Sequence, residues 1–249
     1  MDLTGTVAIV TGGSGTLGGR ICHKLADAGV NIAAIYNEGR EQADVLVNEL
    51  RASGIDADAI RCDVTDPAQV EEMVRAANQR FGRVDILVND AAYNKWISFP
   101  DLDALTYEEW DKIMSINLNG PMYCIKAVAS LMNDLGSGRI VNISSVAGIG
   151  PTGSSIPYAV SKAALIHLTK CMAVALAPKV LVNCVAPGFL ESTKMSANLA
   201  PEYQERAKSS SLLKRAADKD DVALQVVEFC RTDSVTGQTL VVDSGRVFH

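Results

Sequence analysis

Short apolar runs alternate with longer amphipathic stretches along almost the whole chain. Short apolar runs are typical of buried strands, and longer amphipathic stretches are typical of helices with one buried face. The pattern predicts strands at residues 7–10, 31–36, 57–61, 84–88, 139–143, 180–185 and 239–242. It predicts helices at 17–28, 41–53, 65–82, 107–135, 156–176 and 218–231, with a break in the fourth at Gly120-Pro121.

Strict alternation of strands and helices indicates an α/β protein with a Rossmann-type, doubly wound parallel sheet of about seven strands and helices on both faces. No shift in composition marks a linker, so we expect residues 1–249 to form a single dinucleotide-binding and catalytic domain. The polar segment 189–214 has no strong periodicity, and we expect it to form a lid over a substrate.

Composition narrows the function classes. A net charge of −6 argues against a nucleic-acid binder, which needs a basic face. No apolar run approaches the roughly 20 residues of a membrane helix, and no basic segment opens a secretory signal, so we expect a cytoplasmic protein. Six scattered cysteines indicate reduced, mostly buried thiols, and three histidines without ligand spacing indicate no metal site.

A glycine-rich loop joins the first strand to the first helix. Gly13, Gly15 and Gly18 give the spacing G-x-G-x-x-G, which lets a pyrophosphate approach the backbone at a helix N-terminus. The predicted cofactor contacts of this loop are Gly12, Gly13, Ser14, Gly15, Thr16, Leu17 and Gly18. The alternative is a tight strand-to-helix turn without a ligand.

The end of the second strand bears on the choice of cofactor. No acid stands at Tyr36 or Asn37 to bind an adenosine ribose, while Arg40 could pair with a 2′-phosphate and Glu38 could oppose it. This favours NADP(H) over NAD(H), unless Arg40 is only a solvated residue at a helix start. Asp63, after the third strand, could accept a hydrogen bond from adenine.

Tyr158 and Lys162 stand four residues apart on a predicted helix and therefore share one face. An ammonium about 4 Å from a phenol, at an effective dielectric near 20, supplies about 4 kcal/mol, enough to bring the pKa of tyrosine toward 7. Ser145, at the end of the fifth strand, could donate to a developing alkoxide. Singly, each residue also fits an ordinary structural role.

Together these motifs resemble the short-chain dehydrogenase/reductase family, along nearly the whole chain. The glycine loop, Asn89-Asp90-Ala91-Ala92, Ile116-Asn117, Ser145, Tyr158-x-x-x-Lys162 and Pro187-Gly188 occur in the family's order and approximate spacing. The resemblance implies that Tyr158 is the general acid or base and that Lys162 lowers its pKa and holds the nicotinamide ribose. It further implies that Ser145 binds the substrate oxygen and that Asn117 orders a water that relays protons through Lys162.

The resemblance also extends the cofactor site. It implies that Val64 flanks the adenine, Asn89 and Ala91 lie near the cofactor, Pro187 and Gly188 border the nicotinamide, and Ser192 meets its carboxamide. Two departures stand out: Thr16 and Ala92 occupy positions where the single-domain branch has glycine. We expect a locally shifted phosphate loop that still binds the cofactor.

The substrate end is predicted from apolar residues after the fourth, fifth and sixth strands. Tyr93, Trp96, Val146, Phe189 and Met195 suggest a small, largely apolar carbonyl compound or secondary alcohol. A 3-oxoacyl-acyl-carrier-protein reductase is the alternative, although the turn 132–139 offers one base and one acid and little to dock an acidic carrier. The resemblance implies a homotetramer, with a dimer as the fallback.

Two other classes remain open at this stage. A noncatalytic redox sensor on this fold would not need Ser145 and Tyr158 together. A lyase or epimerase would need room for a substrate domain that a chain of 249 residues hardly leaves.

Overall fold

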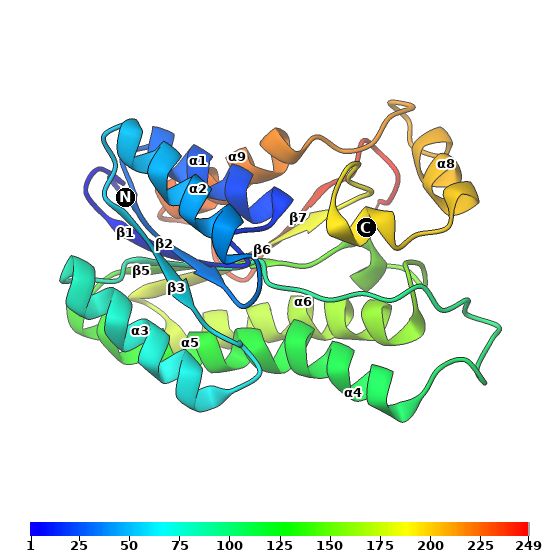
Figure 1. Cartoon of the computed structure of the whole chain (residues 1–249), viewed down its shortest axis with the longest axis horizontal. Coiled ribbons are helices and arrows are strands. Elements are labelled where there is room, and N and C mark those ends of the chain that lie inside the picture. The colour runs from blue at the N-terminus through cyan, green and yellow to red at the C-terminus, as the bar shows by residue number, and fades with distance from the viewer. Residues whose placement is uncertain (249) are drawn as a thin grey trace.

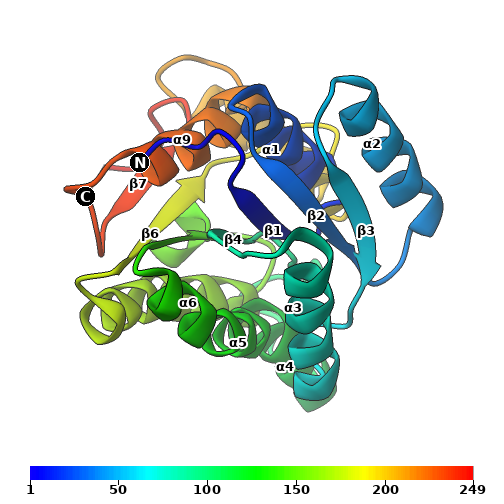
Figure 2. The ribbon, with the colours of Figure 1, turned by 90° about the vertical axis from the view of Figure 1, so that its left-hand side faces the viewer.

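Seven strands form one parallel sheet in the order β3-β2-β1-β4-β5-β6-β7, and Figure 2 shows this twisted sheet between two layers of helices. The computed structural model describes residues 1–248. The strands are β1 (Val7–Thr11), β2 (Asn31–Tyr36), β3 (Ala57–Arg61), β4 (Ile86–Asn89), β5 (Gly138–Ile143), β6 (Val180–Pro187) and β7 (Thr239–Val242). All seven predicted strands match to within two residues at each end, and β6 extends from the predicted 185 to Pro187.

Helices cover both faces of the sheet (Figure 1). One face carries α1 (Thr16–Asp27), α2 (Arg40–Ala52) and α9 (Lys219–Arg231). The other carries α3 (Pro67–Phe81), α4 (Tyr107–Met114), α5 (Gly120–Leu135) and α6 (Ile156–Leu176). Two buried apolar clusters fill the spaces between sheet and helices. The predicted doubly wound α/β fold is therefore confirmed.

The two halves of the sheet meet at β1, and this switch point places the site. β1 pairs with β2 on one side and with β4 on the other, so the connections that leave their carboxyl ends run in opposite directions. Every residue of β1 is buried, as expected for a strand covered on both faces. Parallel sheets bind ligands in the crevice that such a reversal opens.

The predicted break at Gly120-Pro121 is confirmed, because α4 ends at Met114 and a new α-helix, α5, begins at Gly120. A π-helical turn, Ser115–Asn119, joins α4 to α5 directly before these two residues. Pro121 stands in the first turn of α5, where an absent N–H costs little. A Cβ at Gly120 would lie 2.8 Å from Cγ2 of Val64, so glycine lets this helix start lie close to the segment after β3.

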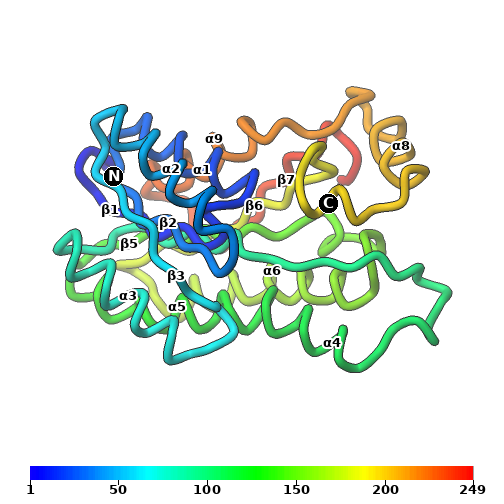
Figure 3. The backbone as a smooth tube through the Cα atoms, viewed as in Figure 1, coloured from blue at the N-terminus to red at the C-terminus, as the bar shows by residue number. Residues whose placement is uncertain are grey.

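The segment 189–214 contains two short helices, α7 (Lys194–Ala197) and α8 (Pro201–Ser209). Figure 3 shows that α8 lies at the same end of the molecule as the connection between β4 and α4. Thr193 and Ser196 cap α7 reciprocally, since each side chain accepts a hydrogen bond from the other residue's main chain. This local capping explains how a segment without strong periodicity still forms a helix.

By length and composition α6 could cross a membrane, with 21 residues and a mean hydropathy of 1.4 over its most apolar stretch. The expectation that no apolar run approaches this length is therefore wrong. In the fold, one side of α6 packs on the sheet and buries Leu165, Thr169 and Ala173. Its apolar character thus reflects a buried side and a further side that remains open at the surface.

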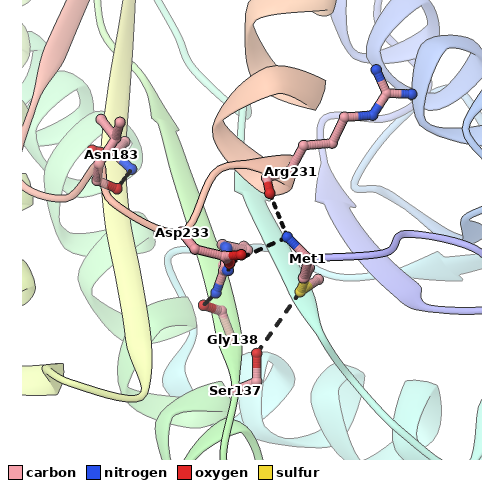
Figure 4. Close-up of polar contacts among 8 residues, drawn as sticks. Met1, Ser137, Gly138, Asn183, Arg231 and Asp233 are labelled. Atoms are coloured by element: carbon pink, nitrogen blue, oxygen red, sulfur yellow. Dashed lines mark hydrogen bonds and ion pairs between the residues drawn. The ribbon is translucent and has the colours of Figure 1, made fainter.

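Met1 contacts several residues at the edge of the sheet where the strands begin (Figure 4). The amino group of Met1 donates to Oδ1 of Asp233 at 3.2 Å and to the carbonyl of Arg231 at the end of α9. The Ser137 hydroxyl lies 3.8 Å from the sulfur of Met1, and Arg139 at the start of β5 pairs with Asp233. This edge is closed by polar contacts, whereas the opposite edge holds the cleft.

Candidate active site

A cleft of about 930 Å³ lies at the carboxyl ends of the strands. It runs from the glycine loop, past the ends of β4 and β5, to α7 and α8. Its wall includes most of the predicted cofactor and substrate residues: Gly12, Ser14, Gly15, Thr16, Leu17, Tyr36, Asn37, Asp63, Val64, Ala91, Tyr93, Ser145, Val146, Tyr158, Lys162, Pro187, Gly188, Phe189 and Met195. Tertiary structure therefore joins predicted residues as far apart in the chain as Gly12 and Met195.

The glycine loop is shaped by close main-chain approaches. Gly12 has a φ of +70°, and a Cβ there would lie 3.0 Å from the main-chain nitrogen of Ala91. A Cβ at Gly18 would lie 2.3 Å from the carbonyl oxygen of Gly12, so only glycine allows α1 to start this close to β1. Gly13 and Gly18 lie behind the wall of the cleft and shape the loop from there.

The N-terminus of α1 is open toward the cleft. Gly15 precedes the first helical residue and has no side chain to cap it, and Thr16 and Leu17 line the cleft. Free N–H groups and the positive end of the helix dipole attract a phosphate at such a terminus. Thr16 thus leaves the phosphate-binding surface open, and the residues present fit a dinucleotide.

At the adenine end, Tyr36, Asn37, Asp63 and Val64 line the cleft as predicted. Arg40 does not: its guanidinium lies outside the cleft wall and pairs with Asp44, four residues along α2, at 3.4 Å. It was predicted to bind a 2′-phosphate because it is a cation soon after the end of β2, but α2 begins at Arg40 and directs its side chain to the surface. Glu38 and Gln42, which were not predicted as cofactor contacts, lie in the wall instead.

Tyr158 and Lys162 are presented by the first two turns of α6. Ser155 caps this helix by accepting from the N–H of Tyr158 at 3.4 Å. The Lys162 ammonium donates to the carbonyl oxygen of Ile143, at the end of β5, over 2.8 Å. It lies 5.9 Å from the centre of the Tyr158 ring.

The pKa values differ from the expectation. Burial raises the pKa of Tyr158 to about 12, with the Ser145 hydroxyl acting in the opposite direction. Burial lowers the pKa of Lys162 to about 8. The expectation that Lys162 brings the Tyr158 pKa toward 7 is wrong in this geometry, because the ammonium is held by Ile143 and burial of the phenol dominates.

Asn117 is fully buried in the π-helical turn, and its side chain is used in hydrogen bonds to neighbouring residues. Its Nδ2 donates to the carbonyl oxygen of Tyr93 at 3.0 Å and to Oγ of Ser161 at 3.1 Å. Its Oδ1 accepts from the N–H of Tyr93 at 2.8 Å. Both amide hydrogens are therefore occupied, and a water ordered by Asn117 would have to use its main chain.

Asn89 lies behind the wall of the cleft. Its amide donates to Asn142 on β5 at 2.8 Å, and Asn142 donates to Thr169 on α6 at 2.9 Å. This chain of hydrogen bonds braces β4 against the helix that carries Tyr158. Ser192 is exposed with a φ of +55° and lies outside the cleft wall, so its contact with the carboxamide stays a prediction.

Trp96 does not line the cleft but supports a residue that does. Its ring lies edge-on to Tyr203 of α8, with 5.4 Å between centres. Tyr203 and Leu199 line the substrate end together with Asn94 and two lysines, Lys112 and Lys194. In the sequence, the four-residue spacing of Leu199 and Tyr203 is the feature that could have indicated this part of the lid.

A lid-to-loop latch also escaped the sequence reasoning. The Asn94 side chain donates to the carbonyl of Met195 at 3.1 Å and accepts from Nδ2 of Asn198 at 3.1 Å. Nothing in the local sequence around Asn94 indicates partners about 100 residues away. These bonds hold α7 over the substrate end.

Comparison with known proteins agrees with this arrangement. The family model described as short chain dehydrogenase matches residues 6–204. A 3-oxoacyl-acyl-carrier-protein reductase of Staphylococcus aureus is 36% identical over 242 residues, which is 96% of this chain and 96% of the relative. An NADPH-dependent 3-quinuclidinone reductase from Rhodotorula rubra has a similar structure, with 25% identity, a TM-score of 0.88 and coverage of 98% and 92% of the two chains.

An actinorhodin polyketide ketoreductase variant solved with NADPH is also similar. It is 30% identical, with a TM-score of 0.88 and coverage of 97% of both chains. The family match spans most of the chain, and the cleft contains the tyrosine, lysine and serine that the motifs indicated. The protein belongs to the short-chain dehydrogenase family and is an NAD(P)-dependent oxidoreductase.

Proposed function

We propose that this protein moves a hydride between NADP(H) and the carbonyl or secondary-alcohol carbon of a small, largely apolar substrate. One observation carries the proposal: Ser145, Tyr158 and Lys162 lie in the wall of a single cleft, between an open helix N-terminus and an apolar end. A dinucleotide along the glycine loop and a substrate against Tyr93, Phe189 and Met195 would meet at these three residues.

When bound, the nicotinamide gives or accepts the hydride. Ser145 donates a hydrogen bond to the substrate oxygen, and Tyr158 donates its phenolic proton to that oxygen as it gains charge. The Lys162 ammonium supplies a buried positive charge near the Tyr158 ring. Asn117 holds the main chain of Tyr93, so its part is to fix the substrate wall.

Burial raises the pKa of Tyr158, so the phenol carries its proton at neutral pH, which is the starting state for reduction of a carbonyl. Oxidation of an alcohol starts instead from the phenolate.

Turnover is tested by offering ketones and secondary alcohols and following absorbance of the reduced nicotinamide. Tyr158→Phe should lower kcat by roughly 10²- to 10⁴-fold while cofactor affinity stays the same. Tyr107→Phe is the control, because Tyr107 is 87% exposed and lies outside the cleft wall. Full activity of Tyr158→Phe would overturn the mechanism.

The preference for NADP(H) is a finer part of the proposal. No acid ends β2, and Arg61 lies next to this end of the cleft, where its Nε donates to the carbonyl of Asn37 at 3.3 Å. Two similar solved structures carry NADPH in their descriptions. Glu38, in the cleft wall, opposes a 2′-phosphate.

Fluorescence titration with NADPH and NADH tests this preference. Arg61→Ala should weaken NADPH binding and leave NADH binding unchanged, and Glu38→Gln should strengthen NADPH binding. Arg40→Ala is the control, because the Arg40 guanidinium lies outside the cleft wall and pairs with Asp44. Tighter binding of NADH than of NADPH by the wild-type protein would refute the preference.

A carrier-bound acyl substrate is the second candidate, favoured by one feature of the cleft. Lys112 and Lys194 are exposed at the substrate end, where no acidic side chain lines the wall in the described part of the chain. A relative at 36% identity is named as an acyl-carrier-protein reductase. Turnover of one 3-oxoacyl group on a carrier and on a short thiol separates the two: carrier dependence that disappears in Lys112→Glu/Lys194→Glu would establish this candidate.

We further infer that residues 1–249 act as one domain, since one cleft contains residues from Gly12 to Tyr203. A cytoplasmic location is supported by six free cysteines, five of them buried.

A homotetramer, or at least a dimer, is supported by the open apolar side of α6, where Val174 is 82% exposed. Val174→Asp should lower the mass seen by light scattering, whereas Val45→Asp on α2 should not.

A further inference from the structure

Asp90 is an acid in the inner wall of the cleft for which the mechanism above has no use. It follows directly on Asn89, the last residue of β4. Thr11 fixes its main chain, because the Thr11 hydroxyl oxygen accepts from the N–H groups of Asp90 and Ala91, each at 3.1 Å. The acid is therefore held at the junction of β1 and β4, beneath the glycine loop.

The carboxylate faces the start of α1. Its Oδ2 would lie 3.0 Å from a Cβ at Gly18, so the absence of a side chain at Gly18 makes room for it. The Gly18 N–H stabilises the charged form of Asp90 as a hydrogen-bond donor. Asp90 thus lies between the phosphate-binding helix and the interior of the site.

The strand register brings Asp90 toward Lys162. Asn89 on β4 is paired with Asn142 on β5, so the next step along the two strands sets Asp90 beside Ile143. Neighbouring strands lie about 4.8 Å apart. The Ile143 carbonyl accepts from the Lys162 ammonium, and Asp90 and Lys162 each act electrostatically on the pKa of the other, so the anion and the cation lie near each other beyond the ends of β4 and β5.

Lys162 lacks a nearer counter-charge. It is 3% exposed, and within residues 1–248 neither Lys162 nor Asp90 has an ion-pair partner within 4.0 Å. A buried ammonium without an opposite charge nearby tends to lose its proton. Asp90 is the group placed to prevent this.

The other titratable groups around the pair are neutral near pH 7. They are Tyr158 on α6, Cys184 on β6 and Cys22 on α1, and burial raises the pKa of each, to about 12 for Tyr158 and about 11 for Cys184. Burial lowers the pKa of Lys162 to about 8, and Asp90 acts against that shift. Burial raises the pKa of Asp90 to about 7, and the positive charge of Lys162 acts in the opposite direction, lowering the pKa of Asp90.

We propose that Asp90 is a positioning residue whose carboxylate keeps the Lys162 ammonium charged through the working pH range. The group acts through Lys162 and does not touch the reacting atoms. Its replacement should therefore change the pH at which Lys162 loses its proton more than it changes the binding of substrate.

The kinetic test compares the pH dependence of kcat in the wild-type protein and in Asp90→Asn, which keeps the shape and removes the charge. The alkaline limb should move to lower pH by on the order of 1 unit. Asp85→Asn is the matched control, because Asp85 is a buried acid just before the other end of β4 and pairs with Arg83. A purely structural Asp90 would lower kcat equally at every pH, and an unmoved limb would overturn the proposal.

A second test needs neither turnover nor an Asp90 variant. This matters because the kinetic arm rests on the proposed function, whereas carboxyl titration does not. Carbon-13 NMR of the full chain should show that Asp90 titrates at higher pH in Lys162→Gln than in the wild type. Equal titration in the two proteins would overturn the proposal even if the enzyme turns over as proposed.

Discussion

The side chain of Asn117 closes two hydrogen bonds on the main chain of Tyr93, donating to its carbonyl at 3.0 Å and accepting from its N–H at 2.8 Å. The two residues come from different elements, the π-helical turn and the connection after β4. The π-helical turn thereby fixes part of the substrate wall, since Tyr93 lines the cleft.

Asn117→Ala should therefore lower both stability and substrate affinity. It leaves the Tyr93 main chain without partners, which costs about 1–3 kcal/mol when such groups are buried. Urea unfolding and KM measure the two effects. Asn119→Ala, at an exposed position of the same turn, is the control, and equal stability of the two variants would contradict the assignment.

Glycine is required at position 18 but not at position 19. A Cβ at Gly18 would overlap the carbonyl oxygen of Gly12 at 2.3 Å, whereas one at Gly19 would rest 3.7 Å from that of Gly13. Gly18→Ala should cost about 1–3 kcal/mol and weaken NADPH binding, and Gly19→Ala should stabilise α1 by up to about 1 kcal/mol. Thermal unfolding and cofactor titration of the two variants check this, and similar losses in both would refute it.

The hydrogen bonds of Asn94 to Met195 and Asn198 should control how firmly the lid is held. Asn94→Ala removes them, so main-chain hydrogen exchange at 194–198 should quicken and KM should rise. Asn48→Ala on the exposed side of α2 serves as the control. Unchanged exchange in Asn94→Ala would show that other contacts hold α7.

Asp90 should make the protein less stable as pH rises from about 4 to 7. Its folded pKa of about 7 lies above the ordinary 3.8, so the folded state binds the extra proton in this window and loses that advantage as the proton leaves. Asp90→Asn lacks this loss. Urea midpoints at about pH 5 and about pH 7.5 should show the variant gaining on the wild type at the higher pH, and a constant difference would contradict the raised pKa.

The sequence predicted the fold closely because its signals are local. Strand and helix periods, the caps and the glycines at helix ends need only nearby residues, and α/β topology follows from their alternation. The break predicted at Gly120-Pro121 matches the start of α5, where proline is tolerated because the first N–H groups of a helix have no partner within it.

The site was predicted where a motif and its partner lie in one segment. Tyr158 and Lys162 share α6, and the glycine loop lies at one junction. The side chains of Arg40 and Ser192, both predicted to contact the cofactor, lie outside the cleft wall, because the direction of a side chain depends on the turn that carries it. Asn94 escaped notice because its partners, Met195 and Asn198, are distant in the chain.

By itself the sequence determined the family, the order of the elements and the chemical groups available, since these follow from residue types and spacing. Tertiary structure alone decided their environment. Burial raised the pKa of Tyr158 and lowered that of Lys162, and the fold placed the Asp90 carboxyl group close enough to act on both. The physical reason is that desolvation and the distance between charges depend on what packs around a group, and neither is written in its neighbours along the chain.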